Sequence, residues 1–212
     1  VGFAIGPRRS DPRTGEILDA DIGMSDGFTR SARRILVDDL ARPRGPDGEM
    51  CEEAATSAQE LHYALDLLEA RGFELDGPEA DALAKAYLKR TIMHEVGHTI
   101  GLRHNFRAST LNDLKKIHDA EFTKVNGMAS SVMDYLPFNI APKGEKQGEY
   151  VMSTIGAYDY WAVEFGYKQF PPGQEEVGLN QILAKSSQRE LQFDTDEDAG
   201  YGSVIGLDPN VN

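Results

Sequence analysis

Three of the chain's five histidines lie within one short segment, residues 94–104, which reads H-E-x-x-H-x-x-G-x-x-H. His94 and His98 are four residues apart, so on a helix they project from the same face and can converge on one metal ion. Gly101 stands where such a helix would end, because glycine readily adopts the left-handed conformation that turns the chain. The turn would bring His104 back towards the ion. The segment therefore predicts one zinc ion held by His94, His98 and His104.

The acidic residue inside this motif, Glu95, is offset from the two helical histidines. A carboxylate placed there can lean over the ion without binding it, which suits a general base for a metal-activated water. A purely structural zinc site would gain nothing from this carboxylate and more often has cysteine ligands. The motif is therefore more typical of a catalytic site than of a structural one.

The other two histidines fall outside the motif, and we predict that both are solvated rather than ligating. His62 would lie on the polar side of a helix, with Asp66 one turn later. His118 stands in a charged run, residues 115–119.

A long helix is predicted to carry the motif. It begins near Pro78, because proline is favoured in the first turn of a helix. The side that we expect to be buried continues into the metal-binding side, through Leu83, Tyr87, Thr91, His94 and His98. The ligands are thus expected on a well-packed element, as a preorganised site requires.

The remaining elements are predicted from hydrophobic periodicity. Residues 1–24 read as a hairpin with a turn-rich run over 7–15, and the second strand, residues 16–24, alternates apolar Leu18, Ala20 and Ile22 with aspartates. Further helices are expected over residues 28–41, 52–71 (stopping at Gly72), 111–122 and 157–165, with a short one around residues 179–183. The acidic run 194–198 lacks the spacing of a calcium loop, so we expect a solvated turn there.

Composition narrows the class of protein. The 212 residues carry a formal net charge of −13, which argues against a nucleic-acid partner. No apolar stretch is long enough for a membrane span. Cys51 is the only cysteine, so no disulfide can form within the chain. The first residues do not resemble a signal peptide and lack an initiator Met, so we expect a processed or excised piece of a longer protein.

With these residues in place, the chain resembles the metzincin zinc metallopeptidases. Besides the motif, residues 131–135 read Ser-Val-Met-Asp-Tyr, which is similar to the Met-turn that underlies the zinc in that group. The resemblance implies that Met133 packs beneath the imidazoles and that Tyr135 approaches the zinc or the developing oxyanion. Residues 159–167 are similar to the helix that closes these domains at the carboxy-terminal end. Because Asn105 and Phe106 follow the third histidine, the chain looks closer to a poorly characterised group of large bacterial zinc-dependent peptidases.

The resemblance carries expectations about fold and function. It implies an α+β, metzincin-like zincin domain over residues 1–167, with a small twisted sheet, and leaves residues 168–212 as an acidic extension of unassigned role. We expect the chain to start partway through the domain, without the strands that normally come first. Residues 16–24 are similar to the edge strand above the cleft, so Leu18, Ala20 and Ile22 are candidate substrate-binding residues. A protein or peptide substrate and export from the cytoplasm are also implied.

Two functions therefore compete. The first is a zinc-dependent endopeptidase that hydrolyses peptide bonds with Glu95 as general base and Tyr135 as a further catalytic group. The second is a non-catalytic zinc-binding or peptide-binding module derived from such an enzyme. Retention of Glu95 favours the first, and the absent front strands favour the second.

Overall fold

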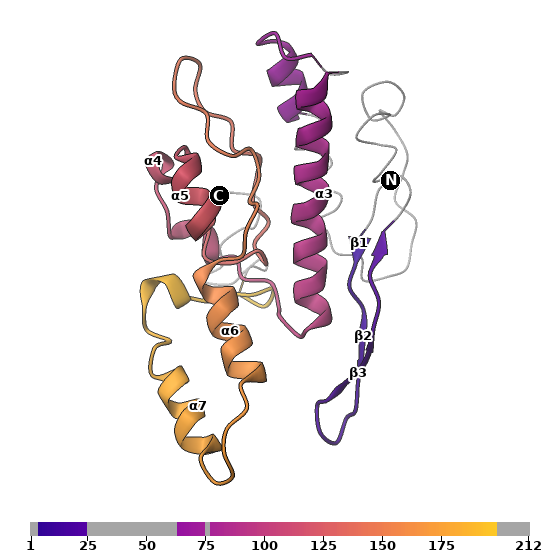
Figure 1. Ribbon diagram of the computed structural model, residues 1–212, viewed down its shortest axis with the longest axis vertical. Helices are drawn as coiled ribbons and strands as arrows, with labels where there is room; N and C mark the ends of the chain where they lie inside the picture. Colours follow the sequence, from indigo (N-terminus) through magenta and orange to yellow (C-terminus); the bar gives the residue numbers. More distant parts are fainter. Residues whose placement is uncertain (1–3, 25–62, 75–76, 199–212) are drawn as a thin grey trace. The chain divides into compact units, whose positions relative to one another are not determined.

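The structure, a computed structural model, describes residues 4–24, 63–74 and 77–198 (Figure 1). Helices dominate it and the strands are short, so the α+β fold class predicted from the sequence is confirmed. The chain divides into two compact units, residues 1–101 and residues 102–212. The predicted helix over 28–41, Cys51 and His62 lie outside the described residues.

The amino-terminal strands pair antiparallel in two short ribbons. β1 (Ala4–Ile5) pairs with β4 (Gly23–Met24), and β2 (Arg8–Ser10) pairs with β3 (Ile17–Ala20). The predicted hairpin is therefore present. The single strand predicted over residues 16–24 is wrong, because the ladder is interrupted between β3 and β4. Pro7 lies opposite the interruption and accepts a hydrogen bond from the Asp21 N–H, but proline has no N–H to return.

The turn predicted for this hairpin also needs correction, and the apolar side chains of its second strand are exposed. β2 occupies part of the run 7–15 that was predicted to be turn-rich. Leu18 and Ile22 have exposed fractions of 60% and 40%, and Ala20 is exposed as well. Among the described strands β3 pairs only with β2. The apolar alternation here therefore marks an exposed strand and not a core face.

The helix that carries the histidine motif is α3 (Pro78–Thr99), and it begins and ends as predicted. Pro78 occupies its first turn, and Gly101 follows its end with φ of 100°. The positions predicted for its inner side are buried from Leu83 to His94, whereas His98 is half-buried. A preceding helical stretch over residues 63–69 buries Leu65 and Leu68 and stops before Gly72, so the described part of the helix predicted over 52–71 is present.

The second unit contains short helices joined by long loops. They are α4 (Leu114–Ile117), α5 (Ala120–Asn126), α6 (Ala157–Tyr167) and α7 (Glu175–Leu183), with single 3₁₀ turns at Ala108–Thr110 and Arg189–Leu191. The helices predicted near 157–165 and 179–183 are confirmed as α6 and α7.

The single helix predicted over residues 111–122 is wrong. Two helices, α4 and α5, replace it because each has its own aspartate at the N-cap. The Asp113 carboxylate accepts a hydrogen bond from the Lys116 N–H, and the Asp119 carboxylate accepts from Glu121 and Phe122. The second cap begins a new helix at the point where the first one stops.

His118, between these helices, is not solvated as predicted. Its side chain has an exposed fraction of only 12%, and its Nδ1 lies 4.0 Å from the Glu145 carboxylate. A loop covers it: the Asn139 amide donates to the Ile117 carbonyl at 2.8 Å, and Gly148 lies against the backbone of residues 117 and 118. The loop comes from far along the chain, so the local charged run did not reveal it.

The segment after α6 packs back onto that helix. The Trp161 indole N–H donates to the carbonyl of Ile182 in α7 at 2.9 Å. The Tyr158 and Phe193 rings are stacked, with centroids 5.7 Å apart. Through these contacts α7 and the residues up to Phe193 pack against α6.

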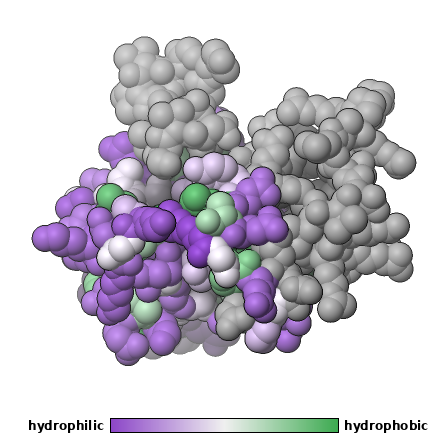
Figure 2. All heavy atoms as spheres, turned by 90° about the horizontal axis from the view of Figure 1, so that it is seen from above, coloured by the Kyte–Doolittle hydropathy of each residue, from purple (hydrophilic) through white to green (hydrophobic). Residues whose placement is uncertain are grey.

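Polar side chains predominate on one face of the described residues (Figure 2). Figure 2 shows a face on which hydrophilic residues predominate and hydrophobic ones form small separate spots. None of the helices in the described ranges is both long and apolar enough to cross a membrane.

Candidate metal centre

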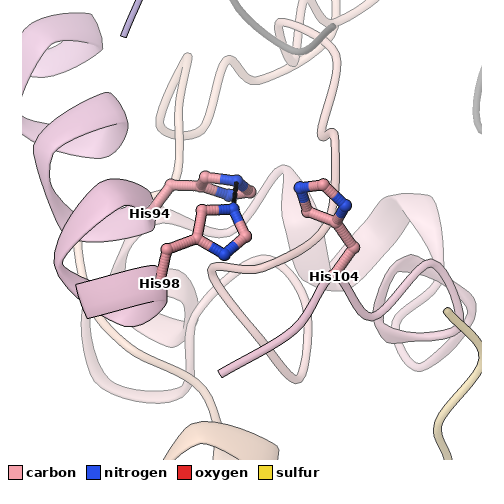
Figure 3. Close-up of side chains that lie close together, drawn as sticks. All are labelled: His94, His98 and His104. Atoms are coloured by element: carbon pink, nitrogen blue, oxygen red, sulfur yellow. Dashed lines mark hydrogen bonds between the residues drawn. The ribbon is translucent and has the colours of Figure 1, made fainter. Parts of the chain in front are cut away.

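Two of the predicted zinc ligands, His94 and His98, project together from α3 (Figure 3). Their Nε2 atoms lie 3.0 Å apart, and the two rings meet edge to face at 83°. In a tetrahedral site with Zn–N bonds of about 2.0–2.1 Å, two ligand nitrogens are roughly 3.3 Å apart. The helical pair is therefore already spaced for one ion.

His104 completes the group. One ligand nitrogen from each of His94, His98 and His104 lies within 4.8 Å of the others (Figure 3). Three imidazoles suit zinc, whereas calcium and magnesium prefer oxygen ligands. The residues present thus fit a zinc ion, and three protein ligands would leave a fourth position for water or substrate, as in catalytic zinc sites.

Glu95 follows His94 in α3 and is buried, with an exposed fraction of 1%. The backbone of Gly6, just after β1, packs directly against it. A Cβ at residue 6 would lie 2.5 Å from the Glu95 carbonyl oxygen and 3.2 Å from its Oε2. Only glycine allows so close an approach, so the first strand helps to fix the carboxylate that the sequence predicts to be the general base.

The amino-terminal hairpin runs beside the last turns of α3. The Arg8 guanidinium donates to the carbonyl oxygen of His98 at 3.0 Å. Ile17, the first residue of β3, reaches to within 4.0 Å of the Cβ position of Gly101. β3, with the candidate substrate-binding residues Leu18 and Ala20, therefore lies next to the helix that carries two of the ligands.

The imidazole of His104 has a polar partner on each ring nitrogen. Its Nδ1 lies 2.6 Å from Oδ1 of Asp196, and its Nε2 lies 3.0 Å from the hydroxyl of Tyr135. A carboxylate only accepts hydrogen bonds, so Nδ1 carries the proton and the tyrosine hydroxyl donates to Nε2. The Phe106 ring stacks on the same imidazole, with centroids 5.4 Å apart. Tyr135 was selected from the sequence as a site residue, but Asp196 was not.

Hydrogen bonds lower the pKa of Asp196. Burial tends to raise this pKa, but hydrogen bonds from His104, from the backbone and from Thr195 act in the opposite direction, so the pKa falls below its ordinary value. Its neighbours in the acidic run are ion-paired too: Asp194 with Arg107, and Glu197 with Arg103. The turn predicted in the acidic run is present at residues 196–198, and its exposed carboxylates are not merely solvated, because Asp196 and Glu197 also have side-chain partners.

The turn around Met133 is fixed by a buried carboxylate. Met133 is fully buried. Asp159, near the start of α6, accepts hydrogen bonds from the Ser131 hydroxyl at 2.6 Å, the Val132 N–H at 2.9 Å and the Gly156 N–H at 2.8 Å. The Ser131 oxygen in turn accepts from the Met133 N–H at 3.0 Å. Burial raises the pKa of Asp159, while these three hydrogen bonds act in the opposite direction.

Comparison with known families decides the classification. A family model described as Met-zincin matches residues 76–212, more than half of the chain. The chain is a Met-zincin. The metzincin resemblance predicted from the motif and from Met133 is thereby confirmed. No curated protein and no solved structure matches this Met-zincin.

The matched region of the Met-zincin includes α3, Met133 and residues 168–212, and it leaves strands β1 to β4 outside. Sequence reasoning missed two residues that hold this site together, Asp159 and Asp196. Asp159 had a local signal, because an acidic residue three positions after the N-cap of a helix often bonds back to that cap. Asp196 had none, since it lies 92 residues after the histidine that it contacts.

Proposed function

We propose that this Met-zincin is a zinc-dependent endopeptidase with Glu95 as its general base. The observation that carries the proposal is the cluster of His94, His98 and His104, with a buried carboxylate on the residue that follows His94. Zinc, when bound, would lower the pKa of a water molecule and polarise the scissile carbonyl group.

The protein's own groups would then move the proton. Glu95 takes a proton from the attacking water as the water oxygen bonds to the carbonyl carbon, and delivers it to the amide nitrogen as the C–N bond breaks. The Tyr135 hydroxyl is a second donor, which would bond to the carbonyl oxygen as negative charge develops on it. Its present bond to Nε2 of His104, at 3.0 Å, supports a place for this hydroxyl near the ligands.

The test compares the parent protein with Glu95→Gln, which keeps the size of the side chain but removes its basicity. Both proteins are assayed for zinc content and for cleavage of a fluorescence-quenched peptide library. We expect equal zinc content and a loss of cleavage by roughly 10²- to 10⁴-fold, the usual contribution of general acid–base catalysis. Glu164→Gln, on an exposed part of α6, is the matched control and should keep full activity. A Glu95→Gln variant that cleaves like the parent would refute the role of Glu95.

The same experiment separates the competing function. A non-catalytic zinc-binding module would hold one zinc ion per chain, yet the parent would cleave nothing in the library. A peptide-binding module would also cleave nothing, with or without zinc. A parent protein that binds no zinc would refute both the endopeptidase and the zinc-binding module.

We further propose that the substrate is an extended peptide that pairs with β3. Support comes from the exposure of Leu18 and Ile22 and from the position of the hairpin beside α3. A cross-strand side-chain pair contributes up to about 1 kcal/mol, so Leu18→Asp should raise KM by up to about fivefold with kcat unchanged. Val177→Asp, at a similarly exposed position in α7, should change neither constant. Equal KM values for the parent and Leu18→Asp would remove β3 from the substrate site.

A further inference from the structure

The third histidine of the motif is held by a carboxylate from the carboxy-terminal part of the chain. Asp196 Oδ1 lies 2.6 Å from Nδ1 of His104, although 92 residues separate the two in sequence. The His104 side chain has an exposed fraction of 12%, whereas that of Asp196 is half exposed. The contact is therefore a specific pairing of one nearly buried imidazole with one carboxylate oxygen.

This contact decides which ring nitrogen of His104 remains for a metal. Because Nδ1 donates its proton to Asp196, the lone pair lies on Nε2. Histidines that bind metals commonly donate their other N–H to a carboxylate or a carbonyl group, which fixes the ring and makes the ligand nitrogen more basic. Asp196 occupies that position with respect to His104.

Asp196 is itself held in place from two sides. Its second oxygen, Oδ2, accepts a hydrogen bond from the Thr195 hydroxyl at 3.2 Å and lies 3.6 Å from the Arg103 guanidinium. Arg103 immediately precedes His104 and also pairs with Glu197. The carboxylate therefore faces His104 in a defined orientation.

The chain before Asp196 is bound along the residues that follow His104. The Phe106 N–H donates to the Asp194 carbonyl at 2.9 Å, and Arg107 pairs with the Asp194 carboxylate at 2.9 Å. The Asn105 side chain donates to the Gln192 carbonyl at 3.0 Å and accepts from the Asp194 N–H at 3.3 Å. These contacts fix the backbone of residues 192–194 against residues 105–107, so Asp196 follows an anchored segment.

We propose that Asp196 is a positioning residue that orients His104 and increases its affinity for zinc. The proposal rests on the zinc site proposed above. It gives the carboxy-terminal segment a function at the metal centre, because residues 192–196 complete the surroundings of the third ligand.

The test measures zinc affinity by competition with a chelator for the whole 212-residue chain and its variants. Asp196→Ala removes the acceptor, and we expect zinc binding to weaken by about 10- to 100-fold. Asp196→Asn keeps an oxygen that can accept from Nδ1 but loses the charge, so its loss should be smaller. Glu197→Gln is the matched control, because it breaks the adjacent ion pair with Arg103 and leaves Asp196 unchanged; its affinity should stay within about twofold of the parent.

A second readout separates positioning from a general effect on folding. The ¹⁵N shifts of the His104 imidazole in the zinc-free protein report which nitrogen is protonated. We expect Nδ1–H to predominate in the parent and in Asp196→Asn, and a mixture of the two tautomers in Asp196→Ala. Asp196→Glu should restore part of the zinc affinity.

The outcomes are distinguishable. If the parent binds no zinc, this inference and the proposed function both fail. If the parent binds zinc and Asp196→Ala binds it equally well, or loses no more affinity than Glu197→Gln, only the role of Asp196 is refuted.

Discussion

The buried carboxylate of Asp159 should be one of the larger contributors to the stability of the second unit. It has an exposed fraction of 2% and accepts hydrogen bonds from Ser131, Val132 and Gly156. Two of these donors belong to the turn that contains Met133, and the third is at the N-cap of α6. Asp159→Ala would leave all three donors without this acceptor.

The size of the effect follows from these three contacts. A net contribution of about 1 kcal/mol for each hydrogen bond gives about 3 kcal/mol for the set. The desolvation of the carboxylate, which also raises the pKa of Asp159, offsets part of this. We therefore expect the free energy of unfolding to fall by about 2–3 kcal/mol. At about 2–4 °C per kcal/mol for chains of 150–250 residues, Tm should fall by roughly 4–12 °C.

The assay is thermal and urea unfolding of the zinc-free protein, followed by circular dichroism. Ser131→Ala removes one of the three donors together with the acceptor of the Met133 N–H, and should cost about 1–2 kcal/mol. Glu164→Gln changes a partly exposed residue of the same helix, whose ion pairs with Lys168 and Lys185 lie at the surface, and should stay within about 0.5 kcal/mol of the parent. If Asp159→Ala is no less stable than Ser131→Ala, the three hydrogen bonds do not act together as argued here.

Three further changes test other parts of the site. Gly6→Ala would place a Cβ 2.5 Å from the Glu95 carbonyl oxygen and should lower the free energy of unfolding by about 1–3 kcal/mol. The control Gly166→Ala, with open space around it, should be neutral or slightly stabilising. Equal stabilities of the two variants would contradict the close packing at Gly6. Tyr135→Phe removes a hydroxyl hydrogen-bonded to Nε2 of His104, so the zinc affinity measured by chelator titration should be unchanged or rise by up to about tenfold. A marked fall in zinc affinity would contradict the placement of this hydroxyl on the ligand nitrogen. Free zinc at about 100 times its Kd should raise the free energy of unfolding by about 2.7 kcal/mol relative to the chelator-treated protein. Equal Tm values with zinc and with chelator would argue against a zinc site in the folded state.

The parts of the site that were predictable are those encoded by local spacing. His94 and His98 lie on one face of α3 because they are four residues apart, and Gly101 adopts the positive φ that the turn to His104 needs. Pro78 marked the start of the helix. Each of these features depends only on residues within a few positions, which is the range over which helix geometry is determined.

The predictions that failed depended on partners from distant segments or on competing local signals. The strand predicted over residues 16–24 breaks opposite Pro7, which lies between β1 and β2 and has no N–H to donate. The helix predicted over 111–122 breaks because Asp119 caps a second helix. His118 is covered by the loop that contains Gly148. Hydrophobic periodicity does not report any of these contacts.

Asn105, the residue after the third histidine, shows how one side chain can link distant segments of the site. In the structure it is fully buried, and its backbone N–H donates to the Met133 carbonyl at 3.0 Å. Its side-chain amide supplies the donor and the acceptor that hold Gln192 and Asp194. Neither a glycine nor an aspartate could make both side-chain contacts. The choice of asparagine is therefore coupled to the carboxy-terminal segment that brings Asp196 to His104.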